Sequence, residues 1–515
     1  MILVIAANVQ ACSPPPQSRR LKDIQMDRIR WKSFVLLFIG LVNTVVAEAP
    51  TAEPGSTAKV PLYQEALRPQ FHFTARQWTV HKLNPVIRPK PPHGGEEGWL
   101  NDPNGLVYYK GEWHLFANGA GSYWVHAVSR DLVHWKELPP KLLRDPVLGN
   151  TASGSAVVDW NNTSGLGTSK ERALLAFFTG WKNKVQCMAY SLDRGRSWTK
   201  HPMNPILRHA DRDPKVFWYE PDSKWVMIVY GPPGRSYIFF GSRDLKQWDK
   251  LSTFPDMYEC PDIFRLPLDG NRKQMKWVLS DGNGSYVIGQ FDGTRFRTEQ
   301  KKEALDYGFN FYATQTWSDV PKDDGRCIQM AWMRGGKFPD MPFNQQLTFP
   351  CVLSLRTVRD KMILCRYPVR EIANLYRKEH SWKNVTASHG NTLLKNIKGD
   401  LFDIEVEFDP GRSDALGFKI HGKDVQYTTK TQAVVSCRTH PMKLVSSNGL
   451  VHLRILVDRT SIEVFCNRGA ITGANCVLPL KNGPPPKLYI NGGDAIIRSL
   501  KVREIKSIWP KNITR

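Results

Sequence analysis

The sequence has few of the patterns that form metal sites, redox-active cysteine pairs or long helices. Its 515 residues include nine cysteines, none of them in a CxxC pair, so no zinc or dithiol motif is visible. No helical hydrophobic period of adequate length appears between about residues 70 and 350. Acidic residues are outnumbered by basic ones, 48 against 71, for a formal net charge of +23. These absences disfavour a cysteine-based metal centre and favour strands over helices.

The excess of positive charge does not indicate a nucleic-acid-binding protein. Lys and Arg are spread along the whole chain, with no basic helix, no aromatic-interleaved basic patch and no zinc finger. We therefore expect a solvated basic surface and no nucleic-acid partner. A hydrophobic content of 41% over this length is enough for a full core in two or three domains.

The N-terminal region has the order of a secretory signal. Arg28, Arg30 and Lys32 precede an apolar run at 34–42, and the small-x-small sequence Ala47-Glu48-Ala49 follows. The run is too short for a comfortable membrane span, so we predict cleavage near Ala49, no stable membrane anchor, and a secreted or extracytoplasmic protein, a periplasmic or cell-surface location included.

Residues 1–49 are thus a predicted leader and 50–67 a linker. Translation from Met26 is an alternative start, and lipid attachment at Cys12 is a weaker alternative because Val9-Gln10-Ala11-Cys12 lacks a good lipobox.

Three short acidic motifs carry the chemistry: WLNDPNG at 99–105, RDP at 212–214 and ECPD at 259–262. Each places a carboxylate beside a proline or an Asn-Gly turn, which holds the side chain at a loop or strand end. Hydrolysis of a glycosidic bond needs one carboxylic acid to protonate the leaving oxygen and a second carboxylate to attack the sugar. Taken singly, each motif could instead be a surface turn or an ion pair.

The spacing of the motifs predicts a radial fold. Asp102 and Asp213 are 111 residues apart, and Asp213 and Glu259 are 46 apart, so only distant loops can bring them together. A repeat in the sequence indicates such a fold. In three places a Ser is followed two residues later by an Asp and then, four or five residues after the Asp, by a Trp. The three copies are Ser129 to Trp135, Ser191 to Trp198 and Ser242 to Trp248. Repeats of about fifty residues with short strands are typical of propeller blades, with a β-sandwich repeat as the alternative.

From about residue 68 to the C-terminus the chain resembles glycoside hydrolase family 32, which includes levanases, inulinases and invertases. The motifs that carry the resemblance are RPQFHF at 68–73, WLNDPNG at 99–105, YYKGEWH at 108–114, SGSAV at 153–157, RDP at 212–214, ECP at 259–261, FYA at 311–313 and VDRTSIEVF at 457–465. The resemblance implies an all-β fold, a five-bladed β-propeller followed by a C-terminal β-sandwich, and retaining cleavage of β-fructosyl bonds.

Domain limits follow from the resemblance and from composition. We expect the propeller at 68–352, a connector that could hold a short helix at 353–375, and the sandwich at 376–510.

The resemblance assigns roles to the acids. Asp102 would be the nucleophile, Glu259 the general acid/base, and Asp213 the transition-state stabiliser that binds fructose hydroxyls. Such carboxylate chemistry needs no metal and no cofactor. The predicted substrate-binding residues are Asn101, Ser153, Arg212, Tyr312 and Trp332. An ordinary salt bridge, a turn residue or core packing is the structural alternative for these positions.

The sequence departs from the family at the pocket wall. After Phe116 the family's aromatic-Gln-aromatic-Asn-Pro segment is replaced by a shorter stretch at 117–124, which removes a Gln and a Trp. Ala152 stands where Phe is usual, and Asn310 where Asp is common. An insertion between Phe73 and Trp99 is either a flap at the rim or a surface loop.

Two functions are compatible with these observations. The first is a retaining exo-hydrolase releasing fructose from levan, inulin or sucrose through a covalent fructosyl-enzyme intermediate, with fructosyl transfer as a variant. The second is a non-catalytic or nearly inactive carbohydrate-binding propeller. The intact acids favour the first. The sequence leaves the linkage preference, the disulfide pairing and the oligomeric state open.

Overall fold

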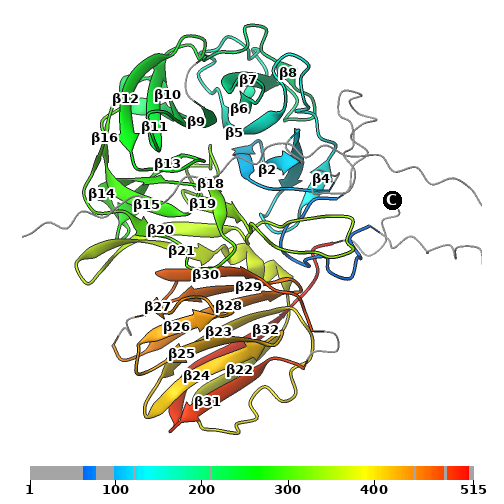
Figure 1. Ribbon diagram of the computed structural model, residues 1–515, viewed down its shortest axis with the longest axis vertical. Helices are drawn as coiled ribbons and strands as arrows, with labels where there is room; N and C mark the ends of the chain where they lie inside the picture. Colours follow the sequence, from blue (N-terminus) through cyan, green and yellow to red (C-terminus); the bar gives the residue numbers. More distant parts are fainter. Residues whose placement is uncertain are drawn as a thin grey trace, which may run out of the picture. The chain divides into compact units, whose positions relative to one another are not determined.

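The computed structural model describes residues 62–76, 98–119, 122–208, 211–444, 448–480 and 484–509 (Figure 1). The predicted leader at 1–49, most of the linker and most of the insertion between Phe73 and Trp99 lie outside the described residues. Within those ranges the chain is almost entirely β-strand, with two short 3-10 helices at Glu220–Asp222 and Arg370–Leu375. The all-β prediction is therefore confirmed.

Three four-stranded antiparallel sheets and one nine-stranded sheet follow one another along the chain and form the five blades of a propeller (Figure 1). The first blade contains β1 (Pro103–Tyr109), β2 (Glu112–Gly119), β3 (Tyr123–Ser129) and β4 (Lys136–Leu138). The second contains β5 (Thr151–Val158), β6 (Leu174–Gly180), β7 (Val185–Ser191) and β8 (Thr199–Lys200). The third contains β9 (Arg212–Tyr219), β10 (Lys224–Gly231), β11 (Ser236–Ser242) and β12 (Asp249–Pro255).

The last two blades join at a single parallel residue pair, Leu268 with Leu355. The fourth blade contains β13 (Asp262–Leu268), β14 (Asn271–Ser280), β15 (Ser285–Phe291), β16 (Phe296–Thr298) and the short β17 (Glu303–Ala304). The fifth contains β18 (Tyr312–Thr316), β19 (Cys327–Trp332), β20 (Cys351–Val358) and β21 (Lys361–Pro368). The expected connector at 353–375 thus begins as paired strands of this blade and ends in the 3-10 helix Arg370–Leu375. The domain limits themselves stay a prediction.

Two further sheets form the C-terminal β-sandwich. The six-stranded sheet contains β22 (Tyr376–Ala387), β32 (Ala495–Ile505), β23 (Phe402–Asp409), β28 (Val451–Asp458), β29 (Ser461–Cys466) and β30 (Ile471–Cys476). The five-stranded sheet contains β27 (Met442–Lys443), β26 (Ala433–Ser436), β25 (Lys423–Thr428), β24 (Ser413–Ile420) and β31 (Lys487–Gly492). Alternating inward side chains of both sheets, such as Ile404 and Val406 of β23 and Leu416 and Phe418 of β24, fill the core between them.

The Asp-to-Trp repeat forms the same turn in three blades, between the third and fourth strands. Asp131 accepts backbone N–H bonds from Val133 and His134, at 3.2 and 2.9 Å. Asp244 accepts equivalent bonds from Lys246 and Gln247, at 2.9 and 3.0 Å. Asp193, in the copy with one extra residue, accepts from Ser197 at 2.8 Å. The sequence repeat therefore corresponds to a structural repeat of blades.

A buried ion pair crosses the middle of the propeller. Lys215 of β9 lies 2.8 Å from Asp262 of β13, and both side chains are almost fully buried. Asp262 also accepts bonds from the backbone N–H and the hydroxyl of Thr316 in β18, at 2.7 and 3.1 Å. The innermost strands of three blades are thus tied together at one carboxylate.

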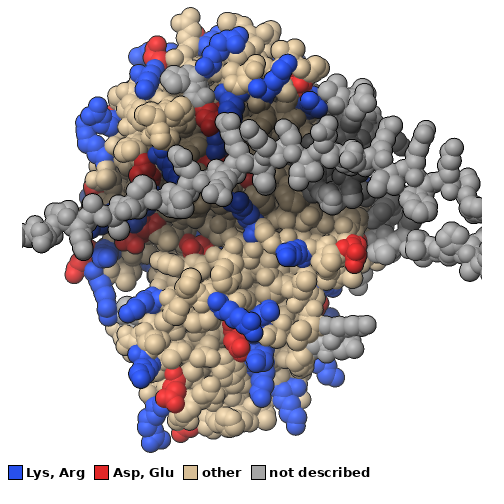
Figure 2. All heavy atoms as spheres, viewed as in Figure 1, with Lys and Arg blue, Asp and Glu red and all other residues tan. Residues whose placement is uncertain are grey.

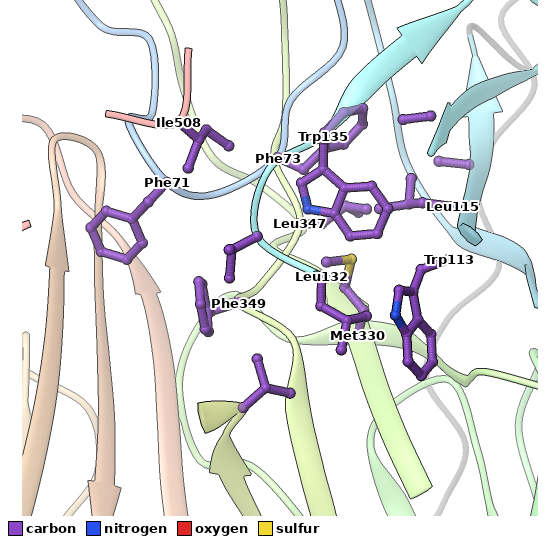
Figure 3. Close-up of a cluster of buried hydrophobic side chains, with 14 of the residues drawn as sticks. Phe71, Phe73, Trp113, Leu115, Leu132, Trp135, Met330, Leu347, Phe349 and Ile508 are labelled. Carbon is purple, nitrogen blue, oxygen red and sulfur yellow. The ribbon is translucent and has the colours of Figure 1, made fainter. Parts of the chain in front are cut away.

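The described segment 62–76 links the propeller to the sandwich. His72 donates from Nδ1 to Asp458, at 2.9 Å, and from Nε2 to Glu463, at 2.8 Å, and all three side chains are buried. Asp458 also accepts the backbone N–H groups of Gln70, Phe71 and His72 at 2.7–2.9 Å. Around this link a hydrophobic cluster draws on both domains (Figure 3), including Phe71, Phe73, Trp135, Leu347, Phe349 and Ile508.

The described residues hold no disulfide, no continuous basic patch on the face in view and no helix that could span a membrane. All eight described cysteines are free. Lys and Arg are scattered over the face shown in Figure 2 without a continuous patch. In the stretches that the structure describes, no helix is long and apolar enough to cross a membrane.

Replacing Lys215 by Met should destabilise the protein by about 3–5 kcal/mol, because the substitution leaves the Asp262 carboxylate buried and unpaired. Chemical denaturation monitored by tryptophan fluorescence measures the change. Arg297→Ala is the matched control, since Arg297 is 68% exposed and its ion pair with Asp292 should contribute less than about 1 kcal/mol. Equal effects of the two substitutions would contradict the prediction.

The His72 link predicts a pH-dependent stability. Burial alone lowers the pKa of His72, but the hydrogen bonds to Asp458 and Glu463 outweigh burial and raise it to about 9. Because an unfolded histidine titrates near 6.5, this stabilisation is complete below about pH 6.5 and is lost as the pH rises through about 9. The pKa values of Asp458 and Glu463 are lowered, so their contribution is lost only in acid.

We therefore expect the free energy of unfolding to fall between pH 6.5 and 9, and the His72→Gln variant to lack most of that slope. Urea denaturation of both proteins across this range measures it. Parallel curves for the two proteins would be inconsistent with a protonated His72.

Candidate active site

Seven of the eight predicted site residues lie at or near the starts of the five innermost strands, and Trp332 ends β19. Asp102 immediately precedes β1, Ser153 lies near the start of β5, Arg212 and Asp213 open β9, Glu259 precedes β13, and Tyr312 opens β18. The inner strands pack side by side around the propeller axis, with β5 between β1 and β9, and β18 against β1 and β13. Strand starts from all five blades therefore meet at one end of the propeller.

An irregular backbone lies at this end. The pairing register shifts between Asn104 and Val107 in β1 and between Thr151 and Gly154 in β5. It shifts opposite the start of β9 and again after Tyr312 in β18. Such bulges re-aim side chains, here at the starts of the inner strands.

Several residues at the same end adopt the left-handed region. The φ angles of Asp213, Glu259, Cys260 and Ala313 are 64°, 41°, 43° and 50°. Each such residue costs of order 1 kcal/mol or more and persists only where its neighbours hold it. Thr179 holds the backbone of Asp213, accepting its N–H at 3.0 Å, and Gly282 donates to the carbonyl of Glu259 at 3.0 Å.

Gly154 shows how tightly the inner strands pack. A side-chain Cβ at this position would lie 1.8 Å from the carbonyl oxygen of Phe177 in the neighbouring strand. Only glycine can therefore follow Ser153 while β5 keeps its place beside β6.

Asp102 lies in a hydrogen-bonded cradle. The Ser153 hydroxyl donates to Oδ2 at 2.7 Å, and the Asn101 amide donates to Oδ1 at 3.1 Å. Burial raises the pKa of Asp102, and these two donors act in the opposite direction because they favour the carboxylate. Trp99 in turn orients Asn101 through a 3.0 Å bond to its side-chain oxygen.

Asp213 is buried next to Asp102. The Cys260 backbone N–H donates to Asp213 Oδ2 at 3.1 Å, and the Cys260 Sγ lies 3.7 Å from that oxygen and 3.9 Å from Asp102 Oδ2. Burial and the negative charge of Asp102 raise the pKa of Asp213 to about 7, against the opposing effects of the Cys260 bond and Arg212. One thiol thus contacts both carboxylates.

Glu259 is held by two partners from other blades. Arg212 forms an ion pair with Oε1, and the Tyr312 hydroxyl donates to Oε2. Arg212 also lies 3.9 Å from Asp213 and over the ring of Tyr230 at 4.7 Å. The two carboxylates of Asp213 and Glu259 therefore share one guanidinium.

The last predicted residue, Trp332, lies beside this group. Its ring is 6.1 Å from Tyr312 and 6.4 Å from Trp99, both edge to face. The Trp332 indole N–H donates to Gln345 at 2.9 Å, and Arg334 lies 4.6 Å above the Tyr312 ring. These contacts form an aromatic wall next to Glu259.

The structure brings all eight predicted site residues to one end of the propeller and adds four that the sequence analysis did not assign: Cys260, Asn118, Thr179 and Trp99. Asn118 of β2 donates to Ser153 at 2.7 Å. Cys260 directly follows the predicted acid Glu259 in the sequence, and this adjacency is the signal that could have identified it as a site residue. Nothing in the sequence pointed to Thr179.

Asn310 binds the sandwich and does not reach the acids. Its side-chain oxygen accepts the N–H of Cys476 at 2.8 Å, and its amide donates to the carbonyl of Arg334 at 2.7 Å. Within the ranges the structure describes, no group of three His, Cys, Asp or Glu side chains is placed to hold a metal ion.

The electrostatic interaction between Asp102 and Asp213 predicts coupled titration. Replacing Asp102 by Asn should lower the pKa of Asp213 from about 7, because the substitution removes the nearby negative charge. Glu259→Gln should lower it less, since Asp102 contributes more to the shift. Carbonyl NMR of protein with ¹³C-labelled aspartate, assigned by comparison with Asp213→Asn, measures both shifts. An unchanged titration in Asp102→Asn would refute the coupling.

Comparison with known proteins agrees with this arrangement. The model of the glycosyl hydrolases family 32 N-terminal domain matches residues 93–368, and that of the family's C-terminal domain matches 371–504. A levanase of Bacillus subtilis is 35% identical over 92% of this chain and 75% of its own length. An extracellular exo-inulinase of Aspergillus ficuum is 28% identical over 87% of this chain and 96% of its own.

Solved structures show the same two-domain architecture. The exo-inulinase from Aspergillus awamori superposes with a TM-score of 0.73 at 25% identity, over 87% of this chain and all of that one. A fructofuranosidase of Schwanniomyces occidentalis, solved with fructosylnystose, gives a TM-score of 0.71 at 25% identity, over 85% of this chain and 98% of its own. The protein therefore belongs to glycosyl hydrolase family 32.

Proposed function

We propose that the protein is a retaining exo-hydrolase that releases fructose from levan, inulin or sucrose through a covalent fructosyl-enzyme intermediate. The observation that carries this proposal is the meeting of three carboxylates from three blades, with Arg212 shared by Asp213 and Glu259 and one thiol in contact with Asp102 and Asp213. Relatives named levanase and exo-inulinase act on the same class of polymer.

Asp102 serves as the nucleophile. Two side-chain donors, Ser153 and Asn101, stabilise its charged form, which must attack the anomeric carbon of the fructosyl unit. Asn118, bonded to Ser153, fixes the hydroxyl that makes the shorter of these two bonds. In the intermediate the carboxylate of Asp102 becomes an ester of the sugar.

Glu259 serves as the general acid and then the general base. It protonates the leaving oxygen as Asp102 attacks, and it deprotonates the water that hydrolyses the ester. The Tyr312 hydroxyl and Arg212 orient its two oxygens.

Asp213 stabilises the transition state by binding fructose hydroxyls. Its pKa of about 7 lets it accept hydrogen bonds as a carboxylate or donate one when protonated. Asn101, Ser153, Arg212, Tyr312 and Trp332 form the rest of the sugar pocket, with Trp332 offering an aromatic surface to sugar C–H groups.

We propose further that the protein acts outside the cytoplasm. The predicted leader at 1–49 supports this location, and relatives from Aspergillus are named as extracellular. A carbohydrate-binding module without catalysis is the less favoured function, because the donors and cations around all three acids are in place.

Replacing Asp102 by Asn or Glu259 by Gln should lower kcat for sucrose and levan by about 10²–10⁴-fold or more, because each removes a reacting group. β-Fructosyl fluoride separates the two roles, since fluoride leaves without protonation. With azide as the second nucleophile, Glu259→Gln should turn over this substrate, whereas Asp102→Asn should not.

The exposed carboxylate Asp494 provides a control, and Asp494→Asn should keep wild-type kinetics. Fructose release and azide adducts are quantified by chromatography. Near-wild-type turnover by either site variant would overturn its assigned role, and no release from levan, inulin or sucrose by the wild-type protein would favour the binding module.

A further inference from the structure

A hollow lies at the opposite end of the inner strands from the acids. Its volume is about 1180 Å³, and the ends of β5, β9 and β13 and the segment after β18 line it. The same strands carry the acids at their starts. Lys215 and Thr316, which bind Asp262 at the axis, form part of its wall, so this buried polar cluster lies between the hollow and the acids.

Two indole rings give the hollow aromatic surface. Trp160 is 50% exposed, although its N–H donates to Asp319 at 2.8 Å and its ring meets Tyr109 edge to face at 5.8 Å. Trp218 is partly exposed and packs edge to face on Trp225 at 5.2 Å. Both rings are therefore held in fixed orientations while part of their surface stays open to solvent.

Polar groups of both signs surround these rings. The hollow is lined by five basic and two acidic side chains: Lys215, Arg265, Arg272, Lys322, Arg326, Glu220 and Asp319. Lys215 pairs with Asp262, and Arg326 pairs with Asp324 and Glu371. When the partner carboxylates Asp262, Asp324 and Glu371 are added to Glu220 and Asp319, the five cations are matched by five carboxylates.

Three of the cations are free to bind a ligand. Arg265, Arg272 and Lys322 are exposed and form no ion pair within the described ranges. Asp319, by contrast, is occupied by the backbone N–H of Val158, at 2.8 Å, and by Trp160. The balanced charge disfavours a polyanion, whereas free N–H donors beside fixed indoles suit a neutral polyhydroxyl ligand.

We propose that this hollow is a second, non-catalytic sugar-binding site that holds a segment of the fructan on which the acids act. The inference rests on the proposed function, because the substrate supplies the neutral polymer. The volume exceeds that of a typical small-ligand pocket, which leaves room for several sugar units. Holding the polymer at a second point raises the local concentration of its ends near the active site.

Comparing polymer and disaccharide kinetics tests the second site. Trp160→Ala and Arg272→Ala should each raise KM for levan about three- to tenfold, because each removes a contact with the polymer, and should leave kcat and KM for sucrose unchanged. Arg297→Ala is the matched control for Arg272→Ala, since it removes an exposed guanidinium that does not line the hollow. It should change neither substrate's KM.

Binding without turnover gives an independent readout. In the catalytically silenced Asp102→Asn protein, mobility in a levan-containing native gel should be retarded, and adding Trp160→Ala or Arg272→Ala should reduce the retardation severalfold. If Trp160→Ala impairs folding, seen as a lower Tm and lost sucrose turnover, Arg272→Ala decides, because Arg272 is exposed and forms no ion pair within the described ranges.

Unchanged levan KM and unchanged retardation in the Arg272 variant would overturn the second site. Failure of the wild-type protein to hydrolyse sucrose and levan would instead count against the proposed catalysis. The native-gel experiment would still test whether the hollow binds levan.

Discussion

The propeller depends on the buried carboxylate of Asp262. Lys215 neutralises it from β9, and Thr316 of β18 donates two hydrogen bonds to it. Leaving a charge in an apolar interior is expensive, so these partners must meet in one arrangement. The relative position of three inner strands follows from that requirement. Asp213 and Glu259, at the starts of β9 and β13, therefore lie only two and three residues along the chain from Lys215 and Asp262, which fix these strands.

Regular packing in the middle of the propeller coexists with strain at one end. Asp213, Glu259 and Cys260 occupy the left-handed region, and bulges interrupt β1 and β5. Hydrogen bonds from neighbouring blades compensate for the strain. The carboxylates are thus held in one orientation, because relaxing any one of them would break contacts with a neighbouring blade.

Local patterns predicted the blades, and the three acids that they singled out lie at one end of the propeller. The Asp131 and Asp244 turns obey short-range hydrogen-bonding rules, so a sequence repeat was enough to indicate a structural one. Contacts between distant residues were not predictable in the same way. The Asn118 bond to Ser153 and the His72 link to Asp458 join positions 35 and 386 residues apart, and no local signal specifies such partners.

The bulges have a consequence for how pocket shape varies. Because each inner strand turns its own side chain toward the acids, one blade can be shortened or substituted while the others keep their geometry. Asn118 of β2 is such a position, since its amide reaches Ser153 of β5 in the next blade. The shape of the pocket can therefore vary blade by blade while the three carboxylates keep their positions.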